Sequence, residues 1–209
     1  MLVVLRVKFL HIYGGTFLLA HFSLFTYTVH LQMQKLSMDA LGRKSVQEFK
    51  ASAKHPLIVV LDNIRSMHNV GSIFRTCDAF LMEGICICGY TPQPPHRDIH
   101  KTALGATETV DWMYVPTASA AVHSLKSLGY SVWGVEQAKG SVPLQQFAIA
   151  SNTKIAIVLG NEVEGVSEDA LSLCDGCIEI PQWGTKHSLN VSVAAGIVLW
   201  ELVKKIQSF

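Results

Sequence analysis

The chain has 209 residues, enough for one ordinary domain with a substantial hydrophobic core. Hydrophobic residues make up 49% of it and charged residues 16%, which excludes an intrinsically disordered chain. With 17 basic and 16 acidic side chains the formal net charge is +1, so a nucleic-acid partner has to be inferred from a site and not from overall charge.

The first 32 residues differ in composition from the rest of the chain. Residues 9–29 contain no formally charged side chain and are about long enough to cross a bilayer, and Arg6 and Lys8 precede them as in the basic start of a signal peptide. Histidines and a glycine pair interrupt this apolar run, however, and no small-residue cleavage site follows it. We therefore expect translation to begin at Met33, with residues 1–32 an extension outside the fold. A membrane anchor is the alternative.

From Met33 onward, predicted strands alternate with predicted helices. Residues 33–55 form a short amino-terminal helical segment, with a polar helix expected over residues 38–52. Continuous aliphatic runs predict strands, and apolar residues at helical spacing predict helices. The strands are expected at 57–61, 84–89, 111–115, 130–135, 154–159 and 176–180, and the helices at 69–82, 118–128 and 190–206. This alternation indicates one α/β domain over residues 56–209, with a mainly parallel sheet flanked by helices.

The five cysteines are odd in number, and a chain of this length does not need disulfides for its stability. A reducing compartment is therefore the expected environment. Cys174 and Cys177 have a spacing found in zinc sites, but a four-cysteine site would also need Cys86 and Cys88, which lie in an apparent buried strand. We expect these cysteines to be structural, and we expect no metal.

Polar loops follow several of the predicted strands, and ligands of α/β proteins bind at the carboxyl ends of strands. In the first loop, residues 62–76, Asn69 can cap the helix that follows. Arg75 lies six residues further on, among apolar neighbours. It either pairs with a structural carboxylate or binds phosphate, which its planar guanidinium suits.

The second loop follows residues 154–159. Gly160 and Gly165 permit a close backbone approach or a positive φ. Glu162 is expected at the carboxyl end of a strand, where it has a functional role or belongs to an ordinary polar turn.

The third loop covers residues 180–192, where Ser188 or Asn190 can cap the last helix. The chain has neither the G-x-G-x-x-G motif of dinucleotide-binding domains nor a P-loop. A hydrolase built on Ser188 and His187 is not supported either, because the nucleophile-elbow motif is absent and adjacent side chains rarely face one another.

Taken together and in order, residues 69–76, 159–165 and 180–192 resemble the three motifs of the SpoU-type (TrmH-like) RNA ribose methyltransferases of the SPOUT superfamily. The resemblance extends from about Pro56 to the carboxyl terminus. It implies transfer of a methyl group from S-adenosylmethionine to a ribose 2′-hydroxyl of tRNA or rRNA. It also implies a carboxyl-terminal trefoil knot and a homodimer, and we expect a cytoplasmic location. The apolar residues of the last helix cover more than one helical stripe, so this helix either contributes to the dimer interface or is buried all round within one subunit. We expect no counterpart, within this sequence, of the separate amino-terminal RNA-binding domain that many relatives carry.

The resemblance also implies roles for individual residues. Arg75 would bind RNA phosphate and stabilise the developing alkoxide, Asn69 and Asn190 would position the substrate or Arg75, and Glu162 would hold the motif loops together. The cofactor pocket would consist of Val135, Glu136, Leu159, Gly160, Ile180, Ser188 and Leu189. RNA contacts are expected from Arg65, His68, Lys186 and His187, with Lys101 a further candidate.

Two alternatives from other functional classes remain. A catalytically idle RNA-binding or assembly protein of the same fold would be expected to lose Arg75, Glu162 or Asn190, and all three are present. A membrane-tethered protein would require residues 1–32 to be part of the mature chain.

Overall fold

The computed structural model describes residues 35–37, 39–150, 153–186 and 188–207. The chain divides into two units, residues 1–42 and residues 43–209. The apolar extension, residues 1–32, lies outside the described residues, so its exclusion from the fold stays a prediction. Within the part that the structure describes, no helix is long and apolar enough to span a membrane.

The single polar helix expected over residues 38–52 is wrong. The structure has a short 3-10 helix, η1 (Asp39–Leu41), and a separate helix, α1 (Val46–Ala51). The interruption has a local cause: Gly42 adopts a positive φ of 56°, and Ser45 starts α1 with a capping box. In that box the Ser45 N–H donates to the Glu48 carboxylate at 2.7 Å, and these hydrogen bonds lower the pKa of Glu48.

The core of the second unit is a seven-stranded sheet in the order β3-β2-β1-β6-β4-β7-β5. Every pairing between neighbouring strands is parallel, which confirms the predicted α/β class with a mainly parallel sheet. The strands are β1 (His55–Asp62), β2 (Met82–Cys88), β3 (Trp112–Val115), β4 (Tyr130–Val135), β5 (Val142–Pro143), β6 (Lys154–Leu159) and β7 (Gly176–Glu179). The trefoil knot stays a prediction, because strand order and register do not establish chain threading.

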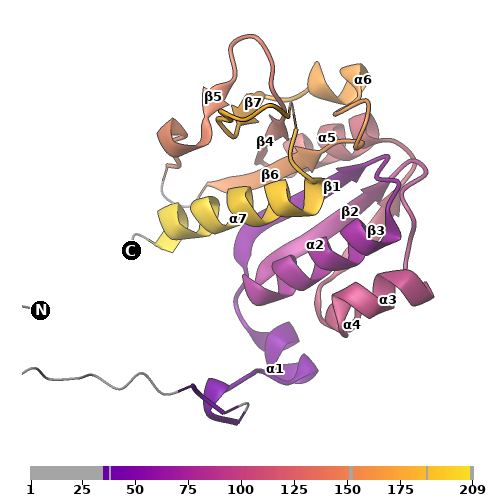
Figure 1. The fold of residues 1–209 in the computed structure, drawn as a ribbon, viewed down its shortest axis with the longest axis vertical. Helices are drawn as coiled ribbons and strands as arrows, with labels where there is room; N and C mark the ends of the chain where they lie inside the picture. The colour runs from indigo at the N-terminus through magenta and orange to yellow at the C-terminus, as the bar shows by residue number, and fades with distance from the viewer. Residues whose placement is uncertain (1–34, 38, 151–152, 187, 208–209) are drawn as a thin grey trace, which may run out of the picture. The chain divides into compact units, whose positions relative to one another are not determined.

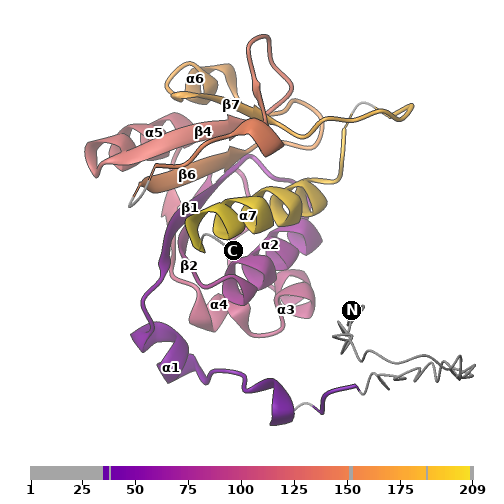
Figure 2. The same cartoon turned by 90° about the vertical axis from the view of Figure 1, so that its left-hand side faces the viewer.

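Helices cover both faces of the sheet (Figures 1 and 2). One face carries α2 (Met67–Ala79) and α7 (Val191–Gln207), with α3 (Arg97–Ala103) and α4 (Ala106–Thr109) packed outside α2. The other face carries α5 (Ala118–Ser127) and α6 (Glu168–Leu171), and a 3-10 helix, η2 (Leu144–Gln146), follows β5. Alternate residues of the central strands serve the two faces: Val59 packs with the α2–α7 core and Val60 with the α5 core.

Element boundaries differ from expectation mainly where a cap was not recognised. The helix expected from Asn69 begins at Met67, because the Ser66 hydroxyl accepts a hydrogen bond from the Asn69 N–H at 3.3 Å. Ser66 therefore caps α2, and the expected cap at Asn69 is wrong. The short elements α3, α4, α6 and β5 were not anticipated, since they have too few residues to establish a periodic pattern.

Candidate active site

The first and second motif loops meet at the carboxyl edge of the sheet through Glu162, which follows β6. One carboxylate oxygen of Glu162 accepts the Arg65 N–H at 3.0 Å. The other accepts the Ser66 N–H at 3.3 Å and the side-chain amide of Asn69 at 2.9 Å. Glu162 therefore binds the first turn of α2, and it holds two loops that are more than 90 positions apart in the chain.

The third motif loop joins this arrangement through Asn190. Its Nδ2 donates to Oδ1 of Asn69 at 3.1 Å, while its Oδ1 accepts the Ser192 N–H at 2.9 Å and the Ser192 hydroxyl at 2.6 Å. The expected capping of the last helix by Asn190 is thus confirmed. Asn69, bonded on one side to Glu162 and on the other to Asn190, is fixed in orientation by both neighbours.

Glu162 is best suited to a holding role. Desolvation raises its pKa, but the hydrogen bonds from the Arg65 backbone, the Asn69 side chain and the Ser66 backbone together lower that pKa below its usual value. A carboxylate that stays ionised well below neutral pH is a weak proton acceptor. Its geometry and its protonation state therefore both favour a structural link between the loops.

Arg75 lies in α2, two turns after His68, and its side chain is exposed. This corrects the expectation that it sits among apolar neighbours: Val70, Ile73, Phe74 and Cys77 form the buried face of α2, and Arg75 lies on the outer face. Within the described residues the guanidinium has no hydrogen-bond or ion-pair partner, so the interpretation as a structural ion pair is not supported. The group is available to an anion from solution.

A cavity of about 330 Å³ lies beside this network. The seven residues predicted to hold the cofactor all line it, although they come from four separate parts of the sequence: Val135, Glu136, Leu159, Gly160, Ile180, Ser188 and Leu189. Glu162 also borders the cavity, so the polar network and the cavity share a wall. The structure brings these residues together, and their role in cofactor binding stays a prediction.

The wall of the cavity near β6 depends on two glycines. A Cβ atom on Gly160 would lie 2.1 Å from the Gly165 carbonyl carbon, so only glycine fits this backbone contact. Gly165 has a φ of 74°, and a Cβ there would lie 2.3 Å from Oε2 of Glu136. The same Glu136 oxygen accepts the Val166 N–H at 3.2 Å, which ties the loop after β4 to the loop after β6.

The charge of the cavity has one sign. Glu136, Glu162 and Glu179 line it, and none of the lining residues that the structure describes is Lys, Arg or His. Glu179 was not anticipated from the sequence; its carboxylate accepts the Ser141 hydroxyl at 2.6 Å. Its only sequence signal is its place near the end of a predicted strand.

Asn161 is a second residue that sequence reasoning missed. It is buried, and its amide nitrogen donates to the Asn63 carbonyl at 2.8 Å and to the Tyr90 hydroxyl at 2.7 Å. Its amide oxygen accepts the N–H groups of Val163 and Glu164. A polar residue directly after a buried strand in a glycine-rich loop was the available signal. Asn161 shapes the turn that presents Glu162.

The residues expected to contact RNA lie in different places. Arg65 and His68 are exposed at the amino-terminal end of α2, near Glu162, and Lys186 is exposed in the loop before α7. His187 lies outside the described residues.

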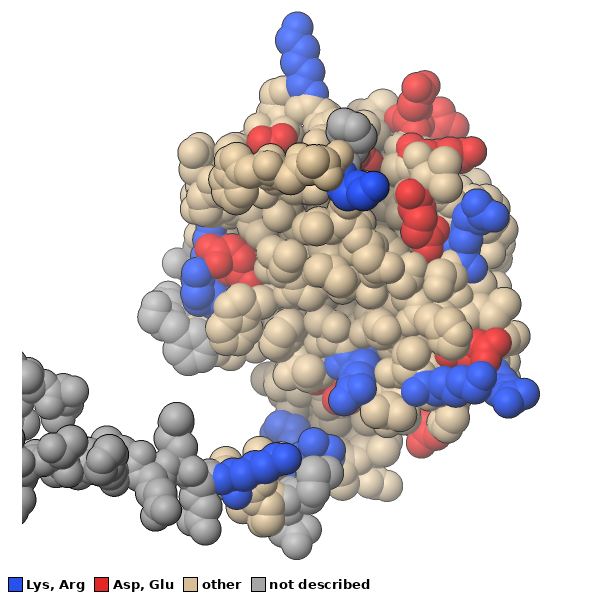
Figure 3. Space-filling model, in the orientation of Figure 1, with Lys and Arg blue, Asp and Glu red and all other residues tan. Residues whose placement is uncertain are grey.

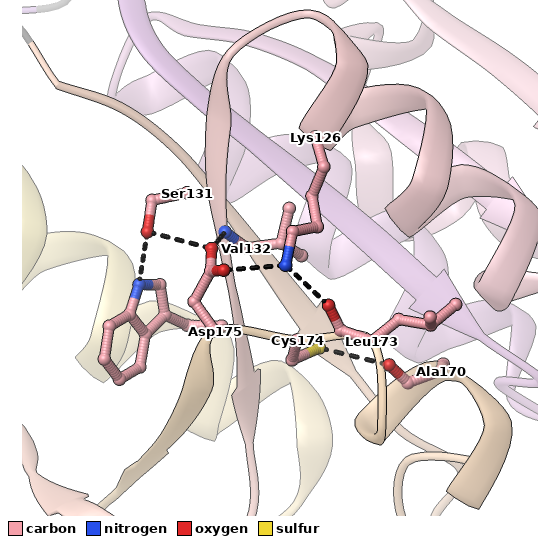
Figure 4. A network of polar contacts seen from close by, with 8 residues as sticks. Lys126, Ser131, Val132, Ala170, Leu173, Cys174 and Asp175 are labelled. Atoms are coloured by element: carbon pink, nitrogen blue, oxygen red, sulfur yellow. Dashed lines mark hydrogen bonds and ion pairs between the residues drawn. The ribbon is translucent and has the colours of Figure 1, made fainter.

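The segment from Cys174 to Cys177 takes part in a polar network that joins the start of β7 to the start of β4 (Figure 4). Asp175 accepts hydrogen bonds from Lys126 at 2.7 Å and from the Val132 N–H at 2.8 Å, and the Cys174 thiol donates to the Ala170 carbonyl. Burial raises the pKa of the Cys174 thiol to about 11. No group of three or more potential metal-binding side chains is found among the described residues.

Helix α7 leaves an apolar stripe in solvent. Val193, Ile197 and Trp200 are 50%, 39% and 52% exposed, and they share one face of the helix. Trp200 also packs against Phe80 beyond the end of α2, with ring centroids 5.7 Å apart. In Figure 3 the region over the middle of α7 is largely free of Lys, Arg, Asp and Glu.

Comparison with known proteins places these features in context. Residues 56–200 match the profile of the family described as SpoU rRNA Methylase family. A putative TrmH family tRNA/rRNA methyltransferase of Staphylococcus saprophyticus is 32% identical over 160 residues, which is 77% of this chain and 63% of the relative. The tRNA (guanosine(18)-2′-O)-methyltransferase of Thermus thermophilus is 32% identical over 163 residues, 76% of this chain and 80% of that protein.

Solved structures agree with the sequence comparison. The TrmH/SpoU tRNA modifying enzyme of A. aeolicus superposes with a TM-score of 0.70 at 28% identity, covering 78% of this chain and 81% of that one. An AdoMet-bound rRNA methyltransferase from Sinorhizobium meliloti gives a TM-score of 0.67 at 27% identity, covering 73% and 57%. The chain spans only 63% and 58% of the length of two staphylococcal relatives.

Proposed function

Since the chain belongs to the SpoU rRNA methylase family, we propose that it transfers a methyl group from S-adenosylmethionine to a ribose 2′-hydroxyl of tRNA or rRNA. One observation carries the proposal: the hydrogen-bonded series Glu162–Asn69–Asn190 joins the three motif loops beside a cavity. The named relatives, which act on tRNA and rRNA, support the substrate class.

The cavity suits S-adenosylmethionine in shape and charge. Apolar side chains such as Leu159 and Ile180 line it together with the tight turn at Gly160, and a lining of apolar side chains and backbone groups suits an adenine ring with its polar edge. The lining carboxylates favour a ligand that carries a positive sulfonium. When bound, S-adenosylmethionine supplies an activated, electrophilic methyl group.

The chain's own residues align and activate the ribose. Arg75, exposed and without a partner among the described residues, binds an RNA phosphate and stabilises the negative charge that develops on the 2′-oxygen as the hydroxyl proton is released to solvent. An Arg is nearly always protonated, so a charge-stabilising role suits it better than that of a proton acceptor. Asn69 and Asn190 position the substrate, and Glu162 keeps their loops in register.

We further propose that the protein works as a homodimer through the exposed stripe of α7. Val193, Ile197 and Trp200 form an apolar surface next to α2, and such surfaces usually mark a partner site. The same proposal includes a carboxyl-terminal trefoil knot and a cytoplasmic location. It also includes RNA contacts from Arg65, His68, Lys186 and His187.

Residues 1–32 are proposed to lie outside the catalytic unit, since the family match begins at residue 56. A chain that starts at Met33 should keep the thermal stability and the activity of the full chain. A large loss of either would show that the segment is integral.

The experiment that tests the reaction class combines binding with turnover. Calorimetry should detect S-adenosylmethionine binding, and addition of tRNA or rRNA should then produce S-adenosylhomocysteine in amounts that depend on the RNA. Binding of RNA without any turnover, under conditions in which the cofactor binds, would favour the catalytically idle alternative. Absence of cofactor binding would overturn the proposal.

A further inference from the structure

Basic and acidic side chains are unevenly distributed along the chain. Seven of the 17 basic residues and two of the 16 acidic ones precede His55, so residues 55–209 carry a formal net charge of −4. The compact unit of residues 43–209 as a whole is close to neutral, with 14 basic and 15 acidic side chains, so its overall charge does not attract a polyanion. An RNA substrate therefore needs a local cationic surface near the site.

Such a surface lies on α3, a helix that no motif includes. Arg97, His100 and Lys101 are exposed on α3, and His96 is exposed directly before it. The single acidic residue of α3, Asp98, is paired with Lys101 at 2.7 Å. Figure 3 shows the Lys and Arg side chains of this region at the position that α3 occupies in Figure 1.

The contact between α3 and α2 is close and specific. A Cβ atom on Gly71 of α2 would lie 2.1 Å from Oγ1 of Thr102 and 2.3 Å from the Ile99 carbonyl oxygen, so the two helices touch where only glycine fits. The Thr102 hydroxyl also donates to the His68 carbonyl at 3.0 Å. Helix α3 is therefore held against the helix that carries Asn69 and Arg75.

Basic side chains are also present on the exposed side of α2, next to α3. His68 and His96 both lie near enough to Asp98 to help lower the pKa of its carboxyl, after the larger effect of Lys101. Arg75 follows His68 by seven residues, or two turns, and so lies on the same side of α2. Within the described residues neither Arg75 nor Arg97 has a carboxylate partner, so both guanidinium groups are available.

We propose that the α3 face, defined as His96, Arg97, His100 and Lys101 together with His68, docks the phosphate backbone of the RNA substrate beside Arg75. This inference rests on the proposed function and adds to it the surface that holds the RNA. Exposed Arg and Lys side chains recognise phosphate by charge and hydrogen bonding, and contacts to phosphate carry no base specificity. The α3 face therefore provides affinity and orientation for RNA of different sequences.

The test compares R97A/K101A with K154A, in both cases in the full chain. Lys154 is also exposed but lies at the amino-terminal end of β6, at the opposite edge of the sheet from the site. RNA affinity is measured by fluorescence anisotropy with tRNA and rRNA fragments at several salt concentrations, and S-adenosylmethionine affinity by calorimetry. A single R97A variant, at an exposed position, provides a second measurement if the double variant is unstable.

The double variant should bind every RNA about tenfold more weakly, and its slope of log affinity against log salt should fall by about one to two. Cofactor affinity should be unchanged, and K154A should match the wild type. Unchanged RNA affinity and salt slope in the R97A/K101A variant, with an active wild type, would overturn the docking proposal and leave the proposed reaction intact. A wild type that binds the RNA without methylating it would instead contradict the proposed function.

Discussion

The side-chain amide of Asn190 donates to the amide oxygen of Asn69 across 3.1 Å, although the two residues are 121 positions apart in the chain. Each lies at the amino-terminal end of a helix, Asn69 in the first turn of α2 and Asn190 directly before α7. The bond therefore sets the relative position of the two helix ends. Because Asn69 also donates to Glu162, a disturbance at any one of the three residues should reach the other two.

Substitution of Arg75 should separate chemistry from cofactor binding. Arg75→Ala is expected to leave S-adenosylmethionine affinity near the wild-type value, since Arg75 does not line the cavity. Methyl transfer should fall by about a hundredfold, the effect expected for loss of a preorganised charge-stabilising group. Single-turnover assays at saturating RNA measure this directly. Transfer within a few-fold of the wild type would show that Arg75 has no part in the chemistry.

Substitution of Glu162 should loosen the site as a whole. Glu162→Ala removes the acceptor for the Arg65, Ser66 and Asn69 donors, and the loop that carries Glu162 lines the cavity. We expect cofactor affinity to fall by about tenfold, because hydrogen bonds to a partly exposed carboxylate have moderate strength. The neighbouring Glu164, whose side chain has no partner among the described residues, provides the control: Glu164→Ala should bind the cofactor normally. Equal cofactor affinities for the two variants would show that Glu162 does not support the cofactor site.

The pH dependence of stability offers a separate check on Glu162. Its pKa is lower in the folded protein than in the unfolded chain, so its contribution is fully present above the unfolded pKa and is lost as the pH falls through the folded pKa. Glu162→Gln should therefore show a weaker loss of stability on acidification than the wild type. Thermal melting between neutral and acidic pH measures the difference.

The acidic lining of the cavity should discriminate between the cofactor and its product. S-adenosylmethionine carries a sulfonium charge that S-adenosylhomocysteine lacks, and a ligand in a cavity of about 330 Å³ lies within roughly one Debye length of the lining carboxylates. Glu179→Gln removes one of these charges without taking away a backbone contact of the motif loops. It should reduce the preference for the sulfonium form by up to about tenfold, measured by calorimetry with both ligands. The same ratio of affinities in variant and wild type would show that Glu179 does not sense the charge.

The stripe on α7 predicts a dimer that a single charge can disrupt. Ile197→Glu places a carboxylate in the middle of the stripe, and burial of an unpaired charge in an interface is unfavourable. The dimer should dissociate at protein concentrations at least about a hundredfold higher than for the wild type, and methyl transfer should fall with it. Leu128→Glu, at an exposed apolar position after α5 on the other face of the sheet, should change neither. Sedimentation at sub-micromolar protein concentration measures the oligomeric state of each variant. A stable, active wild-type monomer would contradict the proposed dimer.

Much of the fold followed from sequence pattern, because its central elements are long and strongly apolar. The runs at Tyr130–Val135 and Lys154–Leu159 predict β4 and β6 with the boundaries that the structure has. Helix α3 was not anticipated, since its seven residues are mostly polar and follow a proline-rich loop. Helix α3 is held in place by contacts with a distant part of the chain, such as that of Gly71 with Thr102. Contacts of this kind leave no periodic pattern in the sequence of the helix itself.

The site was predictable in its composition and less so in its geometry. The order of the three motif segments indicated which residues belong together, and the structure brings Asn69, Glu162 and Asn190 into one network. The exposure of Arg75 was not predicted, because neighbours in sequence on a helix lie on different faces. Glu179 was missed because a strand residue gives no sign of which side of the sheet holds a cavity.

The proposed reaction is defined by the atom that receives the methyl group, the ribose 2′-oxygen. Labelled S-adenosylmethionine is incubated with the protein and RNA, and the RNA is then digested to nucleosides and separated by chromatography. We expect the label to appear in 2′-O-methylated nucleosides, and we expect the Arg75→Ala variant to yield far less of them. Label in base-methylated nucleosides, or no label although cofactor and RNA both bind, would contradict the proposed reaction.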